Sequence, residues 1–320
     1  MGAEEPRRGN TSPFVEGAVT IEVPATSANL GPGFDSLGLA LDYFDTLTAS
    51  IAEGISVVVE GEGEGRLPSG ARHLVVRSMM RAFEHIGVDV PGVQLQCVNR
   101  IPHSRGMGSS SAAIVGGLAL ARALLRDSSS IGDDVMLMLA NEIEGHPDNV
   151  APAIFGGFTI SGQDEDDVWA IRSPINSDLS AVVFIPPTPL STKTARGLLP
   201  DSVPHKDASA NAGRAALLVA ALATEPAYLL RATEDFLHQN YRASAMPESA
   251  QLMQRLRDAG VPAIISGAGP TVLAFTAPGL RDADSLIEDC PAGWRALHLG
   301  IGGSGVRDRG FGEYNTPTAG

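Results

Sequence analysis

A glycine- and serine-rich segment is the part of the sequence best suited to chemistry. It reads Pro-His-Ser-Arg-Gly-Met-Gly-Ser-Ser-Ser-Ala from residue 102 to residue 112. Its two glycines let the backbone approach a ligand closely, because they carry no side chain. Its serines open an apolar helical stretch, and the free amides and dipole at a helix start favour anions. The segment therefore predicts a phosphate-binding loop made of Pro102, His103, Ser104, Arg105, Gly106, Met107, Gly108, Ser109, Ser110, Ser111 and Ala112.

Two familiar phosphate-binding motifs do not fit this loop. A Walker loop ends in Gly-Lys-Ser or Gly-Lys-Thr, and the segment contains no lysine. A dinucleotide fingerprint requires a third glycine at the position that Ser111 occupies. An ordinary serine-capped helix after a glycine turn is the structural alternative, so the loop taken alone is weak support for a nucleotide site.

Three segments, in order along the chain, resemble the signatures of the GHMP superfamily of small-molecule kinases. The loop matches the nucleotide signature Pro-x-x-x-Gly-Leu-Gly-Ser-Ser-x-Ala, with Met107 replacing the leucine. Residues 24–35 look like the first motif in the form found in homoserine kinases. Residues 265–272 resemble the third motif, a glycine turn that braces the phosphate loop. The resemblance covers residues 15–275 and implies ATP as the phosphoryl donor, with two further glycines in its site, Gly267 and Gly269.

The resemblance to homoserine kinases implies an acceptor site for a zwitterionic amino acid. L-Homoserine carries an ammonium, a carboxylate and a hydroxyl, so its site requires an acceptor, an arginine and a group that orients the hydroxyl. Asn29 and Asp35, in a loop rich in glycine and proline, are the expected substrate ligands near the ammonium. Capping of turns is their structural alternative.

A second block resembles the acceptor-side motif of homoserine kinases. It is His-Pro-Asp-Asn-Val-Ala-Pro, residues 146–152. The likeness implies that His146 and Asn149 contact the substrate, with simple packing as the alternative for the histidine. The expected catalytic set is Asp35, Asp148 and Asn149. Asp148 is the nearest candidate for a general base, and the sequence leaves open whether a base is used at all.

The same resemblance implies a magnesium ligand on the helix before this block. Two candidates stand there, Glu142 and Glu144. The spacing favours Glu144, although the segment before His146 is shorter than in some relatives. Ser110 of the phosphate loop is the expected second ligand. The other glutamate would then be a solvated helix charge.

Two short segments resemble those that supply arginines to the substrate carboxylate in this family. They end at Arg196 and Arg242, and an ordinary surface arginine is the alternative for each. The chain has only two lysines, Lys193 and Lys206. Any anion site must therefore use arginine, backbone amides or a metal ion.

The elements that position these residues follow from hydrophobic periodicity. Strands are expected at 19–23, ended by Pro24, then as a hairpin over 45–60, and at 93–97, 153–160, 181–185, 263–265 and 271–275. Helices are expected at 73–86, 109–125, 133–144, 208–223, 227–237 and 248–259.

Strands and helices mixed without regular βαβ alternation favour an α+β fold. The resemblance implies the two-lobed GHMP kinase fold, with an N-terminal nucleotide-binding lobe and a C-terminal α/β sandwich lobe. The expected division is a disordered tail (1–14), an ATP-binding domain (15–165), a C-terminal domain (166–300) and a flexible tail (301–320).

Composition narrows the classes of function. The formal net charge is −14, from 37 acidic and 23 basic residues, which disfavours nucleic-acid binding. The longest apolar run, residues 112–121, is shorter than the roughly 20 residues that a bilayer requires. No secretory signal is evident, and two cysteines suggest a reducing compartment. We therefore expect a cytoplasmic protein without membrane partners; a homodimer is an expectation without support from particular residues.

The expected function is ATP-dependent phosphorylation of L-homoserine in threonine biosynthesis. One alternative is another GHMP kinase of the mevalonate type, but mevalonate has no ammonium to face Asp35. The other alternative is a GHMP protein that binds a ligand and regulates without turnover. The intact loop serines and the magnesium carboxylate disfavour it.

Overall fold

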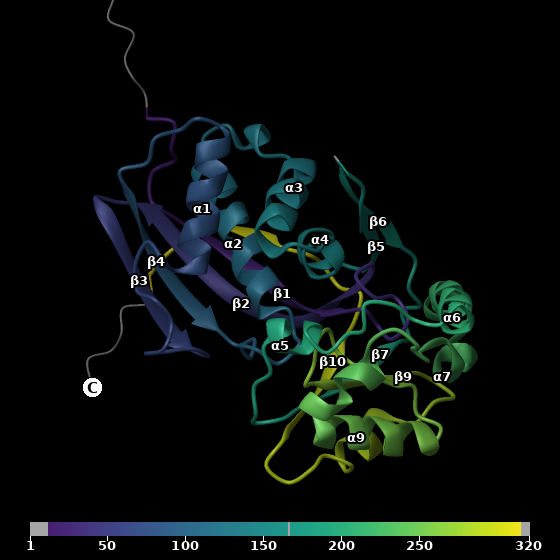
Figure 1. The fold of residues 1–320 in the computed structure, drawn as a ribbon. Helices are drawn as coiled ribbons and strands as arrows, with labels where there is room; N and C mark the ends of the chain where they lie inside the picture. Colours follow the sequence, from purple (N-terminus) through teal and green to yellow (C-terminus); the bar gives the residue numbers. More distant parts are fainter. Residues whose placement is uncertain (1–11, 166, 315–320) are drawn as a thin grey trace, which may run out of the picture.

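The N-terminal lobe is a curved sheet covered on one face by helices (Figure 1). The structure, a computed structural model, describes residues 12–165 and 167–314. The main path of the sheet has the order β11-β1-β2-β4-β3, and β5 and β6 extend it from β2. Its strands are β1 (Ala18–Ala28), β2 (Leu37–Ile51), β3 (Gly54–Gly61), β4 (Gly92–Asn99), β5 (Phe158–Gln163), β6 (Val168–Ser173) and β11 (Arg307–Gly312).

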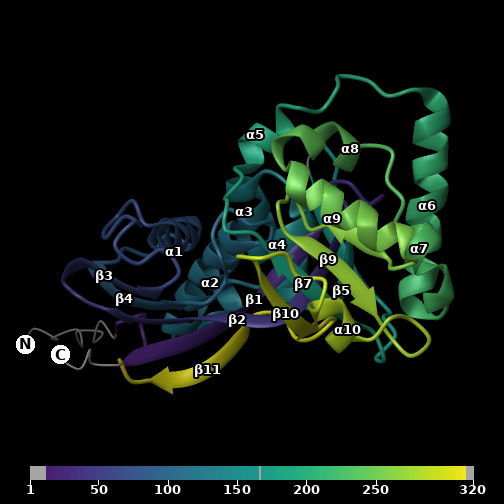
Figure 2. The same cartoon turned by 90° about the horizontal axis from the view of Figure 1, so that it is seen from below.

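Helices cover one face of this sheet (Figure 2). They are α1 (Leu74–His85), α2 (Ser109–Leu124), α3 (Asp133–Glu144) and α4 (Pro147–Phe155). The central one, α2, is buried on nearly all sides and needs its glycines for close packing. An added Cβ at Gly116 would lie 2.3 Å from the Leu47 side chain, and one at Gly117 would lie 2.4 Å from the Val75 carbonyl. Close packing at these two glycines therefore fixes α2 against β2 and α1.

The C-terminal lobe is an antiparallel sheet with the order β10-β7-β9-β8. Alternate residues of its strands face two different cores. Val182 and Phe184 pack with α9 and α10, whereas Val183 packs in the larger core that includes α6 and the N-terminal lobe. The strands are β7 (Ser180–Ile185), β8 (Ala263–Ile265), β9 (Val272–Thr276) and β10 (Arg295–Gly300). The helices are α5 (Thr192–Arg196), α6 (His205–Ala223), α7 (Leu229–Ala232), α8 (Gln239–Arg242), α9 (Pro247–Asp258) and α10 (Ala283–Ile287), with short 3-10 turns at Ser128–Ser130, Pro226–Tyr228 and Ala243–Ala245.

The α+β, two-lobed expectation is confirmed, but the boundaries differ from those expected. Strand β6 pairs with β5, so the N-terminal sheet continues to residue 173 instead of ending at 165. The flexible tail expected at 301–320 contains β11, which pairs with β1 and so satisfies the open edge of that strand. At the other end, Phe14 is buried against Phe83, with ring centroids 5.6 Å apart. The predictions of a disordered N-terminal tail and a flexible C-terminal tail also cover residues 1–11 and 315–320, which lie outside the described part of the chain.

Several local predictions were wrong because pairing and packing overrode the sequence pattern. The predicted hairpin is absent: β3 runs parallel to β4, which lies between it and β2. Strand β1 continues past Pro24 through a bulge. Residues 147–155 form α4 where a strand had been expected from 153, and the helix predicted over 227–237 ends at residue 232. Within the described residues, no helix is both long and apolar enough to cross a membrane.

Candidate active site

The three motif segments meet where the two lobes touch. The backbone N–H of Thr26 donates to the Met107 carbonyl at 3.1 Å, which joins the first motif to the loop. The Ser266 hydroxyl donates to the Gly106 carbonyl at 2.6 Å, which joins the third motif to the same loop. Together they line a cleft of about 190 Å³, open to solvent, whose lining includes Asn29, Asp35, Gly108, Ser110, Glu144, His146, Asp148, Asn149, Arg196, Arg242 and Gly267.

The two loop glycines are required by packing as well as by a ligand. Gly106 and Gly108 have φ values of 73° and 68°, in the left-handed region that favours glycine. A Cβ at Gly108 would lie 1.9 Å from the Thr26 hydroxyl, and one at Gly106 would lie 2.2 Å from the Ser266 carbonyl. The loop is therefore held in one shape by its neighbours, with the first amides of α2 facing the cleft.

The serines at the start of α2 form hydrogen bonds with only one of the two candidate magnesium ligands, Glu142 and Glu144. Ser110 and Ser111 donate hydrogen bonds to the two carboxylate oxygens of Glu144, at 2.8 and 3.2 Å. Glu142 instead pairs with Arg81 on the outer surface, at 2.9 Å. Residues two apart on a helix point in nearly opposite directions, so only one glutamate can face the cleft. The hydroxyl of the remaining serine, Ser109, lies 2.6 Å from Nδ1 of His103.

At the far end of the cleft, Asp35 and Arg196 form a two-pronged ion pair. The N···O distances are 2.7 and 2.9 Å, and the two side chains are 34% and 39% exposed. Asn29 sets the shape of the loop that carries Asp35. Its amide oxygen accepts from the Asp35 N–H, and its amide nitrogen donates to the Gly267 carbonyl, each at 3.0 Å. The amide is thus already engaged at both ends, and turn structure is part of its role.

Arg242 lies beside this pair and is 1% exposed. Among the described residues it has no ion-pair partner, and its buried Nε has no hydrogen-bond partner. Burial and the charge of Arg196 lower the pKa of Arg242 from its ordinary value, although nearby carboxylates oppose this. The guanidinium carbon lies 5.3 Å from the centroid of the Phe34 ring. A buried arginine without a carboxylate partner has guanidinium donors available for an anionic group.

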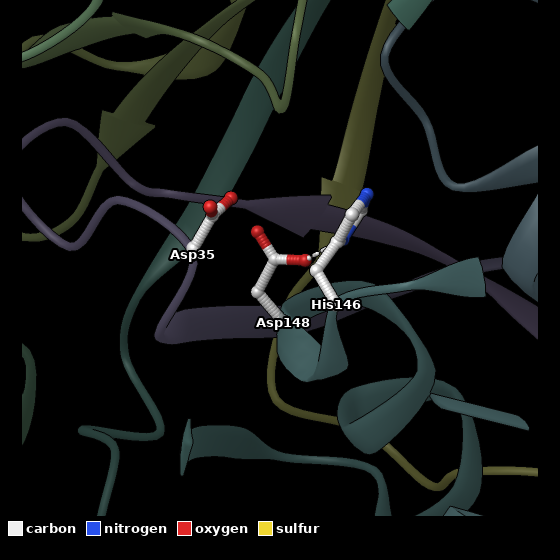
Figure 3. Close-up of side chains that lie close together, drawn as sticks. All are labelled: Asp35, His146 and Asp148. Carbon is white, nitrogen blue, oxygen red and sulfur yellow. Dashed lines mark hydrogen bonds and ion pairs between the residues drawn. The ribbon is translucent and has the colours of Figure 1, made fainter. Parts of the chain in front are cut away.

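His146, Asp148 and Asp35 come together on the wall of the cleft (Figure 3). Nδ1 of His146 lies 2.6 Å from a carboxylate oxygen of Asp148, which is 1% exposed. Burial opposes a charge on His146, but the hydrogen bond and the charges of Asp148 and Glu144 outweigh it and raise its pKa. The three side chains could offer metal ligands within 4.8 Å of one another. Both oxygens of Asp35 are committed to Arg196, however, so Glu144 with the loop serines fits a cation better.

Comparison with known protein families finds matches in both lobes. The model of the GHMP kinase N-terminal domain matches residues 73–157, and that of the C-terminal domain matches residues 215–296. The homoserine kinase of Streptomyces coelicolor is 52% identical over 298 residues, covering 92% of this chain and 95% of the relative. The chain belongs to the homoserine kinase family. The homoserine kinase of Streptomyces avermitilis is 51% identical over 92% of this chain and 96% of its own length.

Solved structures extend the comparison to the fold. A homoserine kinase from Cytophaga hutchinsonii matches with a TM-score of 0.80 and 26% identity, covering 92% of this chain and 98% of that one. A mevalonate kinase from L. major, in complex with R-mevalonate, matches with a TM-score of 0.64 and 14% identity, which shows the shared fold alone.

Some residues that the sequence predicted for the site do not line the cleft of this homoserine kinase family member. They lie behind its wall. Five are buried and absent from the cleft lining: Pro102, Met107, Ser111, Ala112 and Gly269. Arg105 reaches the cleft, but its guanidinium donates to the carbonyls of Pro186, Pro187 and His103 and so ties the loop to the C-terminal lobe. Four residues not anticipated lie in or against the site: Thr192 and Ala268 in the lining, and Phe34 and His238 beside Arg242. Thr192 and Ala268 lie inside recognised motif segments, whereas no local pattern marks His238.

Proposed function

We propose that the protein transfers the γ-phosphoryl group of ATP to the hydroxyl of L-homoserine, giving ADP and O-phospho-L-homoserine for threonine biosynthesis. The observation that carries the proposal is the pairing of Asp35 with Arg196 next to Arg242, which has no ion-pair partner among the described residues, in the same cleft as the glycine- and serine-rich loop. One anionic and two cationic groups match the ammonium and carboxylate of an amino acid. The phosphate loop supplies the donor side.

On the donor side, the amides at the start of α2 and the hydroxyl of Ser110 face the phosphates. Magnesium bound with ATP would neutralise phosphate charge, and Glu144 and Ser110 offer the oxygen ligands that this ion prefers. Glu144 has no cationic partner among the described residues. We therefore assign Glu144 and Ser110 to the metal, and the loop from His103 to Ser110 to the nucleotide phosphates.

On the acceptor side, the substrate zwitterion would enter by ion-pair exchange. Its ammonium would take the place of Arg196 at Asp35, and its carboxylate would take the place of Asp35 at Arg196, with Arg242 as a second partner. A ligand that carries only one of the two charges leaves one member of the pair without a partner, and an unpaired charge in a partly buried site is costly. The exchange therefore favours amino acids over hydroxy acids and amino alcohols.

The reacting hydroxyl would lie between these two regions, beside Asp148 and Asn149. The transition state of phosphoryl transfer is loose, so alignment of the hydroxyl contributes more than covalent chemistry by the protein. Asn149 is held by Thr26, whose hydroxyl donates to its amide oxygen at 2.8 Å, and Asp148 is held by His146. We propose that Asp148 and Asn149 orient this hydroxyl, and that His146, in the wall of the cleft, holds the carboxylate of Asp148 in place.

Coupled measurement of ADP release with several acceptors tests the proposal. Turnover should require L-homoserine and magnesium, and L-serine should be a poor acceptor because its hydroxyl is one methylene closer to the charged groups. Mevalonate and galactose should give no turnover above the ATPase background. Equal turnover with mevalonate would overturn the substrate assignment. ATP binding without turnover of any acceptor would indicate a GHMP protein that is not a kinase.

A further inference from the structure

His238 is buried behind the cleft and touches two parts of the acceptor site. It precedes α8 and lies one helical turn before Arg242. Its Nε2 lies 2.8 Å from the carbonyl oxygen of Gly31, in the loop that carries Asp35. Its Nδ1 lies 3.2 Å from Nη1 of Arg242. The imidazole therefore bridges the loop of the proposed ammonium ligand and the arginine of the proposed carboxylate site.

The two partners determine where the imidazole proton lies. A carbonyl oxygen only accepts hydrogen bonds and a guanidinium only donates them. Nε2 must therefore carry the hydrogen that faces Gly31, and Nδ1 must offer its lone pair to Arg242. A second proton would place two donors face to face and add a cation next to Arg242. Burial, together with the charge of Arg242, lowers the pKa of His238 against the opposing charge of Asp235, which agrees with the neutral ring.

Asp235 does not compete for the imidazole. Its carboxylate accepts the backbone N–H groups of Leu237, His238 and Gln239, at 2.8, 3.1 and 2.6 Å, and so shapes the turn that places the ring. It lies farther from the imidazole, with 3.7 Å between its carboxylate and Nε2 of His238.

Arg242 depends on this arrangement because little else holds it. Among the described residues, its only side-chain hydrogen bond is the one to His238. The Phe34 ring lies under the guanidinium, and the same ring packs 5.3 Å from the imidazole centroid. His238 and Phe34 thus hold the guanidinium of Arg242 while occupying only one of its N–H donors. The other N–H donors of the guanidinium remain available to a ligand.

We propose that His238 is a positioning residue for amino-acid recognition: its neutral imidazole holds Arg242 by accepting one hydrogen bond at Nδ1. This proposal rests on the proposed function, because it assumes that Arg242 receives the substrate carboxylate. Its consequence is that His238 governs homoserine affinity without touching homoserine or ATP.

Two substitutions separate the hydrogen bonds of the ring. In His238→Asn, the amide oxygen can occupy the place of Nδ1 and still accept from Arg242, but the bond to Gly31 is lost. In His238→Gln, the longer amide can occupy the place of Nε2 and still donate to Gly31, but the acceptor for Arg242 is lost. We expect KM for homoserine to rise about five- to tenfold in His238→Gln, the worth of a typical hydrogen bond, and clearly less in His238→Asn. KM for ATP should stay unchanged in both variants.

A purely structural role predicts the reverse order, because only the Gly31 bond would then matter. A rise in His238→Asn equal to or above that in His238→Gln overturns the proposal, and so does an unchanged KM in His238→Gln. The readout tolerates partial unfolding of a variant with a buried substitution, because KM does not depend on the amount of folded enzyme.

Arg242→Ala separates failure of this inference from failure of the proposed function. If Arg242→Ala leaves KM for homoserine unchanged, the carboxylate assignment itself is wrong. If Arg242→Ala raises KM, His238→Gln should add no further rise in that background, because His238 acts through Arg242. An undiminished effect of His238→Gln in the Arg242→Ala background refutes the positioning role and leaves the proposed function intact.

Discussion

Replacing Asp35 with asparagine removes one negative charge and nearly preserves the shape of the side chain. In the free protein the substitution breaks the ion pair with Arg196, whose two side chains are 34% and 39% exposed. Pairs this accessible to solvent contribute about 0–1 kcal/mol, so the free energy of unfolding should fall by less than about 1 kcal/mol. The fold and KM for ATP should therefore be retained.

The effect on homoserine should be much larger. The substrate ammonium would lose a charge-assisted hydrogen bond, which is worth about 1.5–3 kcal/mol. At about 1.4 kcal/mol for each factor of ten, kcat/KM for homoserine should fall about 10- to 100-fold. For 4-hydroxybutanoate, which lacks the ammonium, no such loss is expected, so the preference for homoserine over this analogue should shrink by a similar factor.

The assay is coupled ADP release at varied homoserine, 4-hydroxybutanoate and ATP. Asp133→Asn is the matched control, because Asp133 forms a comparable ion pair with Arg122 at 2.6 Å near the opposite end of α2. The control should leave both acceptors unaffected. If Asp35→Asn lowers kcat/KM for both acceptors equally, the carboxylate does not recognise the ammonium. If instead KM for ATP rises while homoserine is unaffected, the two ends of the cleft have been assigned the wrong way round.

Three further predictions concern the metal ligand, the loop and a buried carboxylate. Glu144→Gln should raise the magnesium concentration needed for half-maximal turnover about 10- to 100-fold, whereas Glu142→Gln, on the outer surface, should leave it unchanged. Gly108→Ala should lower the free energy of urea unfolding by about 1–3 kcal/mol more than Gly145→Ala, because both glycines have positive φ but only the first would create a clash; equal losses would contradict the packing role. Burial raises the pKa of Asp45 from 3.8 to about 6, so the folded state binds its proton more tightly and this contribution to stability is lost as pH rises from 4 through 6. Asp45→Asn should therefore stabilise the protein relative to the wild type by about 3 kcal/mol above pH 7 and little below pH 4, measured by urea unfolding; a difference independent of pH would contradict this account.

Much of the fold could be predicted from the sequence because its longest elements carry their own periodic pattern. The helices from 74, 109 and 133 and the strands at 92–99 and 180–185 lie where apolar spacing placed them. The pairing of strands could not be predicted this way. Alternation marks a strand and not its neighbour, so nothing local revealed that β4 would lie between β2 and β3 or that the C-terminal segment would form β11 on the edge of β1.

The sequence by itself predicted the glycine- and serine-rich loop and the helix that it opens, since these residues are adjacent in the chain and interact locally. It also determined that an anion site must use arginine, backbone amides or a metal ion, because lysine is scarce. Packing decides which side of α3 faces the cleft, and it places the carboxylate of Glu144 there while Glu142 lies on the outer surface. Only the tertiary structure paired Asp35 with Arg196 and placed His238 between Gly31 and Arg242. Asp35 and Arg196, and likewise Gly31 and His238, are far apart in the chain. Long-range contacts of this kind arise from the way the two lobes pack, which no local spacing encodes.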